Sequence, residues 1–274
     1  MPIKKDTFSR AVLIVIYNKP IEKSMVYRKF MKFNKEDLLI VYDNSRQVMG
    51  NESLKSIGIY KHDPRNLGLY EAYNYAIDVC RKKKIEWVTI FDQDTEIPDD
   101  FFDVLSSKIK DLSESVACIV PNVILGNGKS ISPGILENQL FMLRKPNMSS
   151  TKVAINSGNT IHVSQFDDSC ELFTSRYPLD FLDYDFFKKL SEKKLEIEVL
   201  PISLIQNLSV SNYSNMSDAR FKQFVKYERK FVIEYYHSEI LQYYIKLFLR
   251  ILKLFFKKKQ FEKIKIILDA MKGK

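Results

Sequence analysis

The sequence predicts an α/β fold for the N-terminal part of the chain and a helical extension for its C-terminal part. Four short apolar runs rich in β-branched residues come early, and an amphipathic helical pattern separates the third run from the fourth. Strands that alternate with helices are typical of a layered structure built on a parallel sheet. The 274 residues, 45% of them apolar, are enough to bury a substantial core.

The expected strands are the four apolar runs, at residues 11–17, 37–43, 56–62 and 86–92. The first run is too short for a signal peptide, so we expect a buried strand there. Ligands bind at the carboxyl ends of strands in such sheets, and Asp43 and Asp92 fall at two of those ends. The helix before the last strand is indicated by apolar residues three and four positions apart, namely Leu69, Ala72, Tyr73, Ala76, Ile77 and Cys80.

Beyond residue 94 the pattern predicts shorter and mixed elements. Before this residue strands and helices alternate, whereas after it the expected strands do not alternate regularly with helices. The expected elements are a helix after Pro98, strands within 116–125 and 152–163, a hairpin turn at Asn127–Gly128, a helix within 178–194, a strand at 196–205 and helices from about Met216.

The segment Asp92-Gln93-Asp94 places two carboxylates directly behind a buried strand. Such charges are costly unless they are hydrated or neutralised by a cation. Mg²⁺ or Mn²⁺ with a nucleotide is usually held by one or two carboxylates, while phosphate oxygens and water complete its coordination. The segment therefore indicates either a divalent metal site that accompanies a nucleotide or a solvated acidic turn that begins the next helix.

Charge and cysteine content narrow the classes of partner. Of the formal charge of +9, residues 240–274 carry +8, from ten basic and two acidic side chains, and the remaining 33 basic and 32 acidic side chains nearly cancel. No zinc-finger spacing or aromatic RNA-stacking pattern accompanies this charge, so we expect no nucleic-acid partner. Cys80, Cys118 and Cys170 lack metal-binding spacing and are expected to be reduced core thiols of a cytoplasmic protein.

Six segments together carry a resemblance to a known family. They read AVLIVIYNKP, LLIVYDNS, HDPRNLGLYEAYNYAI, WVTIFDQDTEIPDDF, AINSGNTIHVSQF and PLDFLDYDFFKKL. In this order and spacing they resemble family 2 glycosyltransferases of the GT-A fold, a Rossmann-like mixed sheet that binds nucleotide-diphospho-sugars. Within that family the DQD, Asn-Ser-Gly and LDFLDYDFF segments are most similar to bacterial rhamnosyltransferases, which use dTDP-L-rhamnose. The resemblance implies a catalytic domain at 1–212 and a helical, basic extension at 213–274.

The resemblance implies that the donor's base and ribose lie at the ends of the first two strands. Tyr17 and Asn18 match the Tyr-Asn pair beside the nucleobase and ribose. Asp43 matches an acid that accepts a hydrogen bond from N3–H of uracil or thymine. Asp92 would face the ribose or the sugar, and Asp94 would bind the metal that bridges the diphosphate, with Asp92 beside it.

Further donor-site residues follow from the same resemblance. Arg65 would approach the phosphates next to the turn formed by Asn66 and Gly68, with Asn74 on the following helix. The sugar pocket would be bordered by Ser157 and Gly158.

Asp183 matches the catalytic base of the family. An inverting transfer needs a carboxylate opposite the leaving diphosphate, where it takes the proton from the acceptor hydroxyl. Two positions depart from the family pattern: Gln206 stands near the place where many relatives carry a metal-binding His, and Asp185 replaces the usual Glu.

The sequence therefore predicts an inverting, metal-dependent glycosyltransferase. It would transfer L-rhamnose from dTDP-rhamnose to a cell-surface polysaccharide or a lipid-linked glycan. A UDP-hexose donor stays open, because Asp43 cannot separate thymine from uracil. A non-catalytic, membrane-associated protein that binds sugar nucleotides is the alternative from another functional class.

Residues 240–274 predict an amphipathic helix with a basic end. Too many cations cross this apolar stretch for a membrane span, but it suits a helix that lies in an anionic interface. We therefore expect a peripheral location at the cytoplasmic face of the bacterial cell membrane; packing on the catalytic domain or in a homodimer is the alternative use of these helices. The polar stripe of the helix consists of Gln242, Lys246, Arg250, Lys253 and Lys257, at steps of 4, 4, 3 and 4 residues.

Overall fold

The computed structural model describes most of the chain and groups it into two compact units. The described residues are 8–34, 36–50, 54–136, 143–144, 152–168, 171–206, 216–258 and 260–273. One unit comprises residues 1–134 and 151–207, and the other comprises 135–150 and 208–274. The predicted domain boundary between residues 212 and 213 lies outside the described residues.

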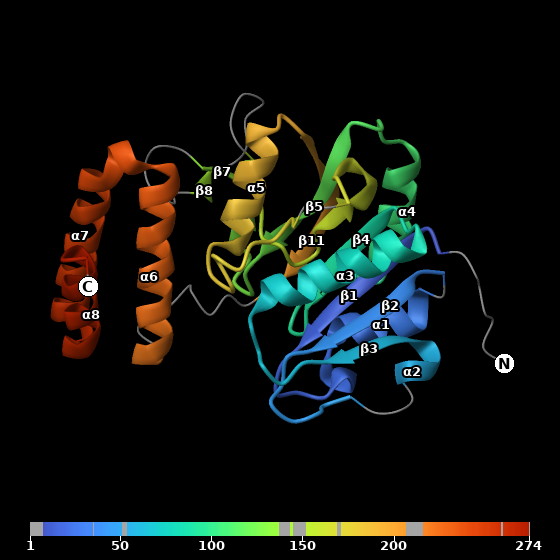
Figure 1. The fold of residues 1–274 in the computed structure, drawn as a ribbon, viewed down its shortest axis with the longest axis horizontal. Helices are drawn as coiled ribbons and strands as arrows, with labels where there is room; N and C mark the ends of the chain where they lie inside the picture. Colours follow the sequence, from blue (N-terminus) through green and yellow to red (C-terminus); the bar gives the residue numbers. More distant parts are fainter. Residues whose placement is uncertain are drawn as a thin grey trace. The chain divides into compact units, whose positions relative to one another are not determined.

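The first unit is built on an eight-stranded mixed sheet (Figure 1). β1 to β4 run parallel to one another, whereas β10 runs antiparallel between β4 and β5. The four strands expected in the first hundred residues are therefore confirmed, as is the mixed character of the later ones. The strand order is β11 (Glu196–Ile205), β5 (Val116–Ile124), β10 (Thr160–His162), β4 (Trp87–Asp92), β1 (Arg10–Ile16), β2 (Leu38–Asp43) and β3 (Gly58–His62), with β6 (Ser130–Ser132) paired to β5.

Helices on both faces explain why the central strands read as continuous apolar runs. Val12, Leu39 and Phe91 belong to a buried cluster that also takes side chains from α1 (Met25–Phe33), α2 (Leu54–Ile57) and α4 (Phe101–Lys110). α3 (Leu69–Lys83) packs against β1 and β4 on the other side of the sheet (Figure 1). Of the six positions predicted from the helical spacing, Leu69 is half-buried and the other five are buried, namely Ala72, Tyr73, Ala76, Ile77 and Cys80.

Several smaller elements complete the first unit. Gly128 has a φ of +81° in the turn between β5 and β6, so the predicted hairpin at Asn127–Gly128 is confirmed. Cys80 and Cys118 are buried free thiols, as expected, and Cys170 lies outside the described residues. The remaining bounds are η1 (Ile21–Lys23), β9 (Lys152–Val153), η2 (Val163–Gln165) and α5 (Leu182–Glu192).

The second unit contains three mutually contacting helices, so the expected C-terminal helical region is confirmed. These are α6 (Asp218–Tyr235), α7 (Ile240–Lys258) and α8 (Phe261–Met271), with a short helix η5 (His237–Glu239) between the first two. The short strands β7 (Gly134–Leu136) and β8 (Leu143–Arg144) pair with each other. Within the residues placed by the structure, no helix has the length and apolar character needed to cross a membrane.

Candidate active site

The carboxyl ends of β1, β2 and β4 bring the predicted donor-site residues to one edge of the sheet. The register pairs Ile16 with Asp43 and Val15 with Asp92, so Tyr17 continues the chain between these two acids. The side chain of Gln93 bridges the backbone N–H and C=O of Tyr17, at 2.9 and 3.1 Å. The middle residue of the DQD segment therefore ties β1 to β4, and the two aspartates remain available to a ligand.

Asp92 has two hydrogen-bond donors and no cationic partner among the described residues. Nε2 of Gln206 donates to Oδ2 of Asp92 at 3.0 Å, and the hydroxyl of Tyr73 lies 3.5 Å from Oδ1. Burial and the neighbouring charge of Asp94 raise the pKa of Asp92 to about 6. A desolvated carboxylate without a cationic partner readily binds a cation, and the bound cation would lower the pKa of the carboxyl group again.

Asp183 lies in the first turn of α5, close enough to Asp92 for the charges of the two carboxylates to interact. Burial raises the pKa of Asp183 to about 7, and the charges of Asp180 and Asp92 act in the same direction. The backbone N–H of Tyr184 donates to Oδ1 of Asp183 at 3.0 Å. A carboxyl group that titrates near neutrality has the property required of a general base.

Asp185 has a different environment from Asp183, although the two are only two residues apart. Its side chain is fully buried and pairs with Lys189 at 2.7 Å and with Arg176 at 3.9 Å. These cations neutralise the carboxylate, which therefore stabilises α5. Among the residues that the structure describes, the predicted base thus differs from its neighbour in having no ion pair.

The backbone just before Asp183 is strained. Phe181 has a φ of +65°, a left-handed conformation that a bulky side chain rarely adopts. The preceding loop is held by Gly68, whose neighbour Leu69 donates its N–H to the carbonyl of Pro178 at 2.7 Å. Because a Cβ on Gly68 would lie 2.2 Å from that carbonyl oxygen, the position requires glycine. The turn predicted at Asn66 and Gly68 therefore supports the loop that leads into α5, the helix of the predicted base Asp183.

Asn74 also fastens a loop near α5. Its Nδ2 donates to the carbonyl of Phe173 at 2.6 Å and to Glu171 at 3.2 Å, while its Oδ1 accepts from the N–H of Phe173 at 3.1 Å. These bonds engage both ends of the amide. In this structure Asn74 contacts the chain around residue 173, where we had expected contact with the donor.

Arg65 is held by acids but keeps an exposed guanidinium. It pairs with Asp63 at 2.6 Å and lies 3.6 Å from Glu71, yet 61% of its side chain is exposed. The Arg65 hydrogen bonds hold the pKa of Asp63 well below its usual range. The side chain is thereby oriented while part of its surface can still reach a phosphate group.

Asp43 organises the loop that follows β2. Its carboxylate accepts hydrogen bonds from Ser45 N–H at 2.9 Å, Met49 N–H at 2.8 Å and Tyr60 hydroxyl at 2.6 Å. Burial acts to raise the pKa of Asp43, but these hydrogen bonds outweigh burial and lower it. The Ser45 side chain also hydrogen-bonds to this fully buried carboxylate, so its roughly four acceptor positions are occupied within the protein. Asn18, whose N–H donates to Ser45 Oγ at 2.8 Å, is joined to the same loop.

Ser157 and Gly158 form hydrogen bonds with the end of β4 and with the DQD turn that follows it. Ser157 Oγ accepts from the N–H of Asp92 at 3.1 Å and is hydrogen-bonded to Thr95 Oγ1. Gly158 has a φ of +87° and donates its N–H to the carbonyl of Ile90 at 2.7 Å. The Asn-Ser-Gly segment thus fixes the backbone from which Asp92 and Asp94 project.

The donor atoms at this edge fit a hard cation that shares its coordination with a ligand. Asp94 is exposed, and its charge acts on the neighbouring Asp92. The described residues hold no group of three or more His, Cys, Asp or Glu side chains with metal-ligand geometry. Two carboxylates without a third protein ligand match the usual Mg²⁺ arrangement, in which phosphate and water fill the other positions.

The family model described as Glycosyl transferase family 2 matches residues 12–167, more than half of the chain. The chain belongs to glycosyl transferase family 2. The matched segment of this glycosyltransferase contains the DQD turn and Ser157–Gly158, whereas Asp183 and Gln206 follow it. No curated protein sequence matches the chain.

Solved structures support the GT-A fold of this glycosyltransferase. S. aureus TarS is 14% identical with a TM-score of 0.50, and the match covers 82% of this chain and 44% of TarS. The structure of S. aureus TarS 1–349 in complex with UDP-GlcNAc is also 14% identical, with a TM-score of 0.51 over 92% of this chain and 74% of that one. The chain thus spans less than half the length of the first of these structures. At this identity the likeness concerns the fold alone.

Three contributions to the site escaped the sequence interpretation. Tyr73 was counted only as a core position of its helix, although a hydroxyl at the core face near the strand ends could have indicated a contact with Asp92. Gln206 was seen as a missing metal ligand, and the structure makes it a hydrogen-bond donor to Asp92. The strained φ of Phe181 has no signal in the sequence, because bulky residues rarely adopt it.

Proposed function

We propose that this protein is an inverting, metal-dependent glycosyltransferase that transfers L-rhamnose from dTDP-rhamnose to a cell-surface polysaccharide or lipid-linked glycan. The observation that carries the proposal is the pair Asp92 and Asp183, two partly buried carboxylates with raised pKa values at the ligand-binding edge of a family 2 sheet. The fold likeness to TarS 1–349, which was solved with UDP-GlcNAc, supports a nucleoside diphosphate sugar as the donor class.

The donor would lie along the carboxyl ends of β1, β2 and β4. Tyr17, with 48% of its surface exposed, offers a ring face to the base. Asp43 would accept a hydrogen bond from the N3–H of thymine or uracil in exchange for one of its present donors. The exposed guanidinium of Arg65 would bind a phosphate oxygen. Ser157 would act by holding the turn that carries Asp92 and Asp94.

Asp183 would act as the general base in the transfer step. Its carboxylate removes the proton from the acceptor hydroxyl while the hydroxyl oxygen bonds to the anomeric carbon, and the bond from that carbon to the diphosphate oxygen breaks with its electron pair. The products are the glycoside, the nucleoside diphosphate and protonated Asp183. Bound Mg²⁺ or Mn²⁺, held by Asp92 and Asp94, would neutralise charge on the leaving diphosphate.

A UDP-hexose donor is the second candidate, since the contact proposed for Asp43 is common to uracil and thymine. A panel of dTDP-rhamnose, UDP-glucose and UDP-GlcNAc with Mg²⁺ or Mn²⁺ distinguishes the candidates by thermal shift and by nucleoside diphosphate release with a bacterial lipid-linked glycan fraction. We expect the largest shift and the fastest release with dTDP-rhamnose. A stronger response to a UDP-sugar would replace the donor assignment, and binding without release would favour the non-catalytic alternative.

The proposed place of action is the cytoplasmic face of the bacterial cell membrane, where the lipid-linked acceptor would be available. The concentration of positive charge in residues 240–274 supports a peripheral association with an anionic surface.

A further inference from the structure

Two residues of the polar stripe of α7, Lys246 and Arg250, face the interior of the helical unit, whereas Gln242 and Lys253 are exposed. Arg250 is 8% exposed, and its two terminal nitrogens donate to the carboxylate of Glu228 on α6 at 2.7 and 2.9 Å. Lys246 Nζ and the Tyr243 hydroxyl approach the same carboxylate at 3.2 and 3.4 Å. Lys246 and Arg250, which the sequence placed on the polar stripe, are therefore turned toward α6, where Glu228 neutralises them.

The opposite side of α7 exposes a continuous row of large apolar side chains, which we call the outward face. They recur three, four and seven residues apart, as residues on one side of a helix do. Phe261 at the start of α8 extends the row, since its ring centroid lies 6.2 Å from that of Phe255. The members, between 36% and 75% exposed, are Leu241, Ile245, Phe248, Leu249, Leu252, Phe255, Phe256 and Phe261.

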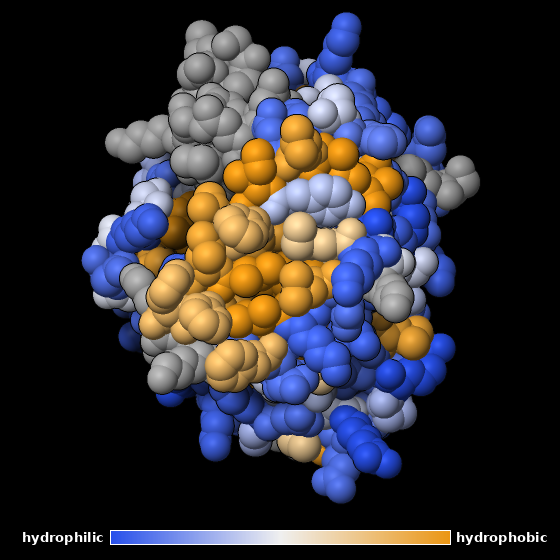
Figure 2. Space-filling view, turned by 90° about the vertical axis from the view of Figure 1, so that its left-hand side faces the viewer, coloured by the Kyte–Doolittle hydropathy of each residue, from blue (hydrophilic) through white to orange (hydrophobic). Residues whose placement is uncertain are grey.

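The outward face is a contiguous apolar patch, whereas the apolar residues of an ordinary protein surface are scattered singly. Figure 2 shows apolar side chains gathered over a broad area on this side of the protein. Contiguous apolar patches of this kind mark sites that bind protein or membrane. α7 is thus an amphipathic helix whose ion-paired residues face α6 and whose exposed side carries apolar side chains.

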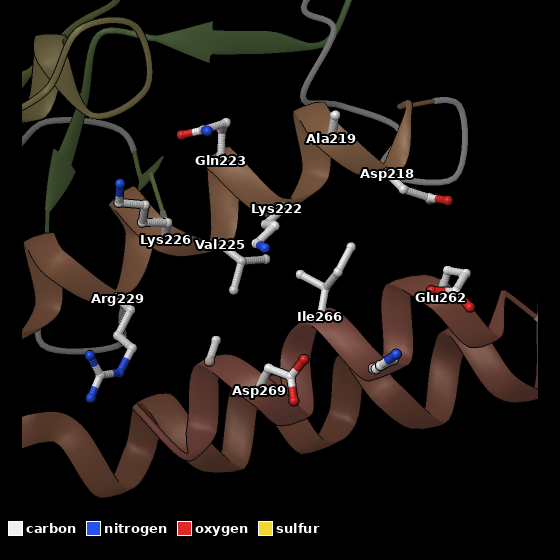
Figure 3. A pocket seen from close by; sticks show the side chains of 12 residues that line it. Asp218, Ala219, Lys222, Gln223, Val225, Lys226, Arg229, Glu262, Ile266 and Asp269 are labelled. Atoms are coloured by element: carbon white, nitrogen blue, oxygen red, sulfur yellow. The ribbon is translucent and has the colours of Figure 1, made fainter. Parts of the chain in front are cut away.

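The other side of the helical unit is polar. A cavity of about 670 Å³ lies between α6 and α8 (Figure 3). Its lining alternates cations such as Lys222 and Arg229 with acids such as Glu262 and Asp269. Lys263 of α8 also pairs with Asp218 of α6 at 2.9 Å. The cavity lining therefore presents mixed charges, in contrast to the outward face.

The distribution of charge indicates what covers the outward face. Residues 216–274 carry fifteen basic and six acidic side chains, a net charge of +9, while the other residues carry 28 of each sign. All of the net charge therefore belongs to the helical segment. A second copy of the same segment would bring two strongly positive surfaces together, whereas an anionic bilayer would attract them. Lys253 is exposed, and Lys257 and Lys258 directly follow Phe256 in the sequence.

We propose that the outward face of α7, together with Phe261, docks into the boundary between headgroups and acyl chains of an anionic lipid bilayer. The buried cluster of Glu228, Lys246 and Arg250 sets the rotation of α7 that presents this face. The proposal extends the membrane association proposed above by naming the face. Its test uses neither donor nor acceptor, so its outcome is separate from that of the transferase assignment.

The test compares vesicle binding of the full chain and of the double variant Leu249→Glu, Phe256→Glu. Sedimentation with vesicles of equal parts phosphatidylglycerol and phosphatidylcholine should bring down the unchanged chain and not the variant, whose partition should fall by roughly a hundredfold because two inserted apolar side chains are replaced by charges. Vesicles of phosphatidylcholine alone should bind the unchanged chain weakly. The milder variant Leu249→Gln, Phe256→Gln should fall in between.

Met31→Glu is the matched control, since Met31 is an apolar helix residue, 41% exposed, in the other unit. It should leave vesicle binding unchanged. Circular dichroism of each variant verifies that the helices form. The proposal is overturned if the unchanged chain does not sediment with anionic vesicles or if the double variant binds as well as the unchanged chain. It is also overturned if light scattering finds a dimer that Leu249→Glu, Phe256→Glu dissociates, which would assign the face to a second copy.

Discussion

Carboxylates in the two units of this protein have opposite electrostatic surroundings. In the sheet unit, burial raises the pKa values of Asp92 and Asp183, to about 6 and about 7, and neither forms an ion pair among the described residues. In the helical unit, burial acts to raise the pKa of Glu228, but Arg250 and Lys246 outweigh it and hold the pKa below its usual value.

The difference separates a functional carboxylate from a structural one. A buried carboxylate with two cations is neutralised and holds helices together, as Glu228 joins α6 to α7. Desolvated carboxylates without cations raise the energy of the folded protein, and they persist where a ligand, a metal or a proton uses them. Asp185 and Asp183 repeat this contrast within one turn of α5, because within the described parts of the chain Asp185 forms ion pairs and Asp183 does not.

The largest effect should come from a carboxylate in the sheet unit that has no protein cation. Asp94→Ala should abolish the increase in dTDP affinity that Mg²⁺ produces, because it removes one of the two proposed ligands. Isothermal titration with and without Mg²⁺ measures this change. Asp103→Ala, an exposed acid in the first turn of α4, is the control and should behave as the unchanged protein. Metal-dependent binding that survives Asp94→Ala would contradict the assignment.

Glu228→Gln tests the structural side of the comparison. The substitution removes the charge that faces buried Arg250 and half-buried Lys246, so the free energy of unfolding should fall by about 3–5 kcal/mol. Urea unfolding followed by circular dichroism measures the loss. Glu262→Gln, an exposed position on α8, should change stability by less than about 0.5 kcal/mol. Equal stability of the two variants would show that the ion pairs do not hold the helices.

The two kinds of carboxylate should also respond to pH with opposite sign. Asp183 prefers its protonated form when folded, so its contribution to stability is lost as pH rises from 3.8 through about 7. Asp183→Asn should therefore melt higher than the unchanged protein at pH values above 7, with the difference vanishing near pH 4. Glu228 prefers its ionised form, so its contribution is lost as pH falls below about 4.5. Melting curves across this range for both variants reveal whether the signs differ.

Catalysis should follow the ionised fraction of Asp183. The transfer rate should reach a plateau above pH of about 7 and fall about tenfold for each pH unit well below that value, because the base must be deprotonated. A rate that stays flat down to pH 5 would assign the proton transfer to another group.

Local sequence patterns were sufficient to predict the strands and the positions of the acids. The apolar runs are continuous because helices cover both sheet faces, so the ends of β2 and β4, with Asp43 and Asp92, could be located from the sequence. α1 and α2 were not predicted. α2 has only four residues, too few for a helical period, whereas the amphipathic pattern of α1 was present in the sequence and was overlooked.

The environment of each side chain depends on residues distant in the sequence and could not be predicted. Gln206 meets Asp92 across 114 positions, and Arg250 meets Glu228 across 22. The stripe in α7 was correctly located as a polar row, but its direction depended on one glutamate in another helix. Asn74 likewise bonds to the backbone at residue 173 because α3 and that loop are adjacent only in the folded chain.

The most direct measurement of the central claim is the effect of Asp183→Asn on dTDP binding and on transfer, measured on the same preparation. The account predicts an unchanged dissociation constant for dTDP in the presence of Mg²⁺ and a rate of nucleoside diphosphate release lower by two or more orders of magnitude, the usual scale for a lost general base. Asp111→Asn, at an exposed position, should keep both values. Full transfer activity in Asp183→Asn would contradict the account.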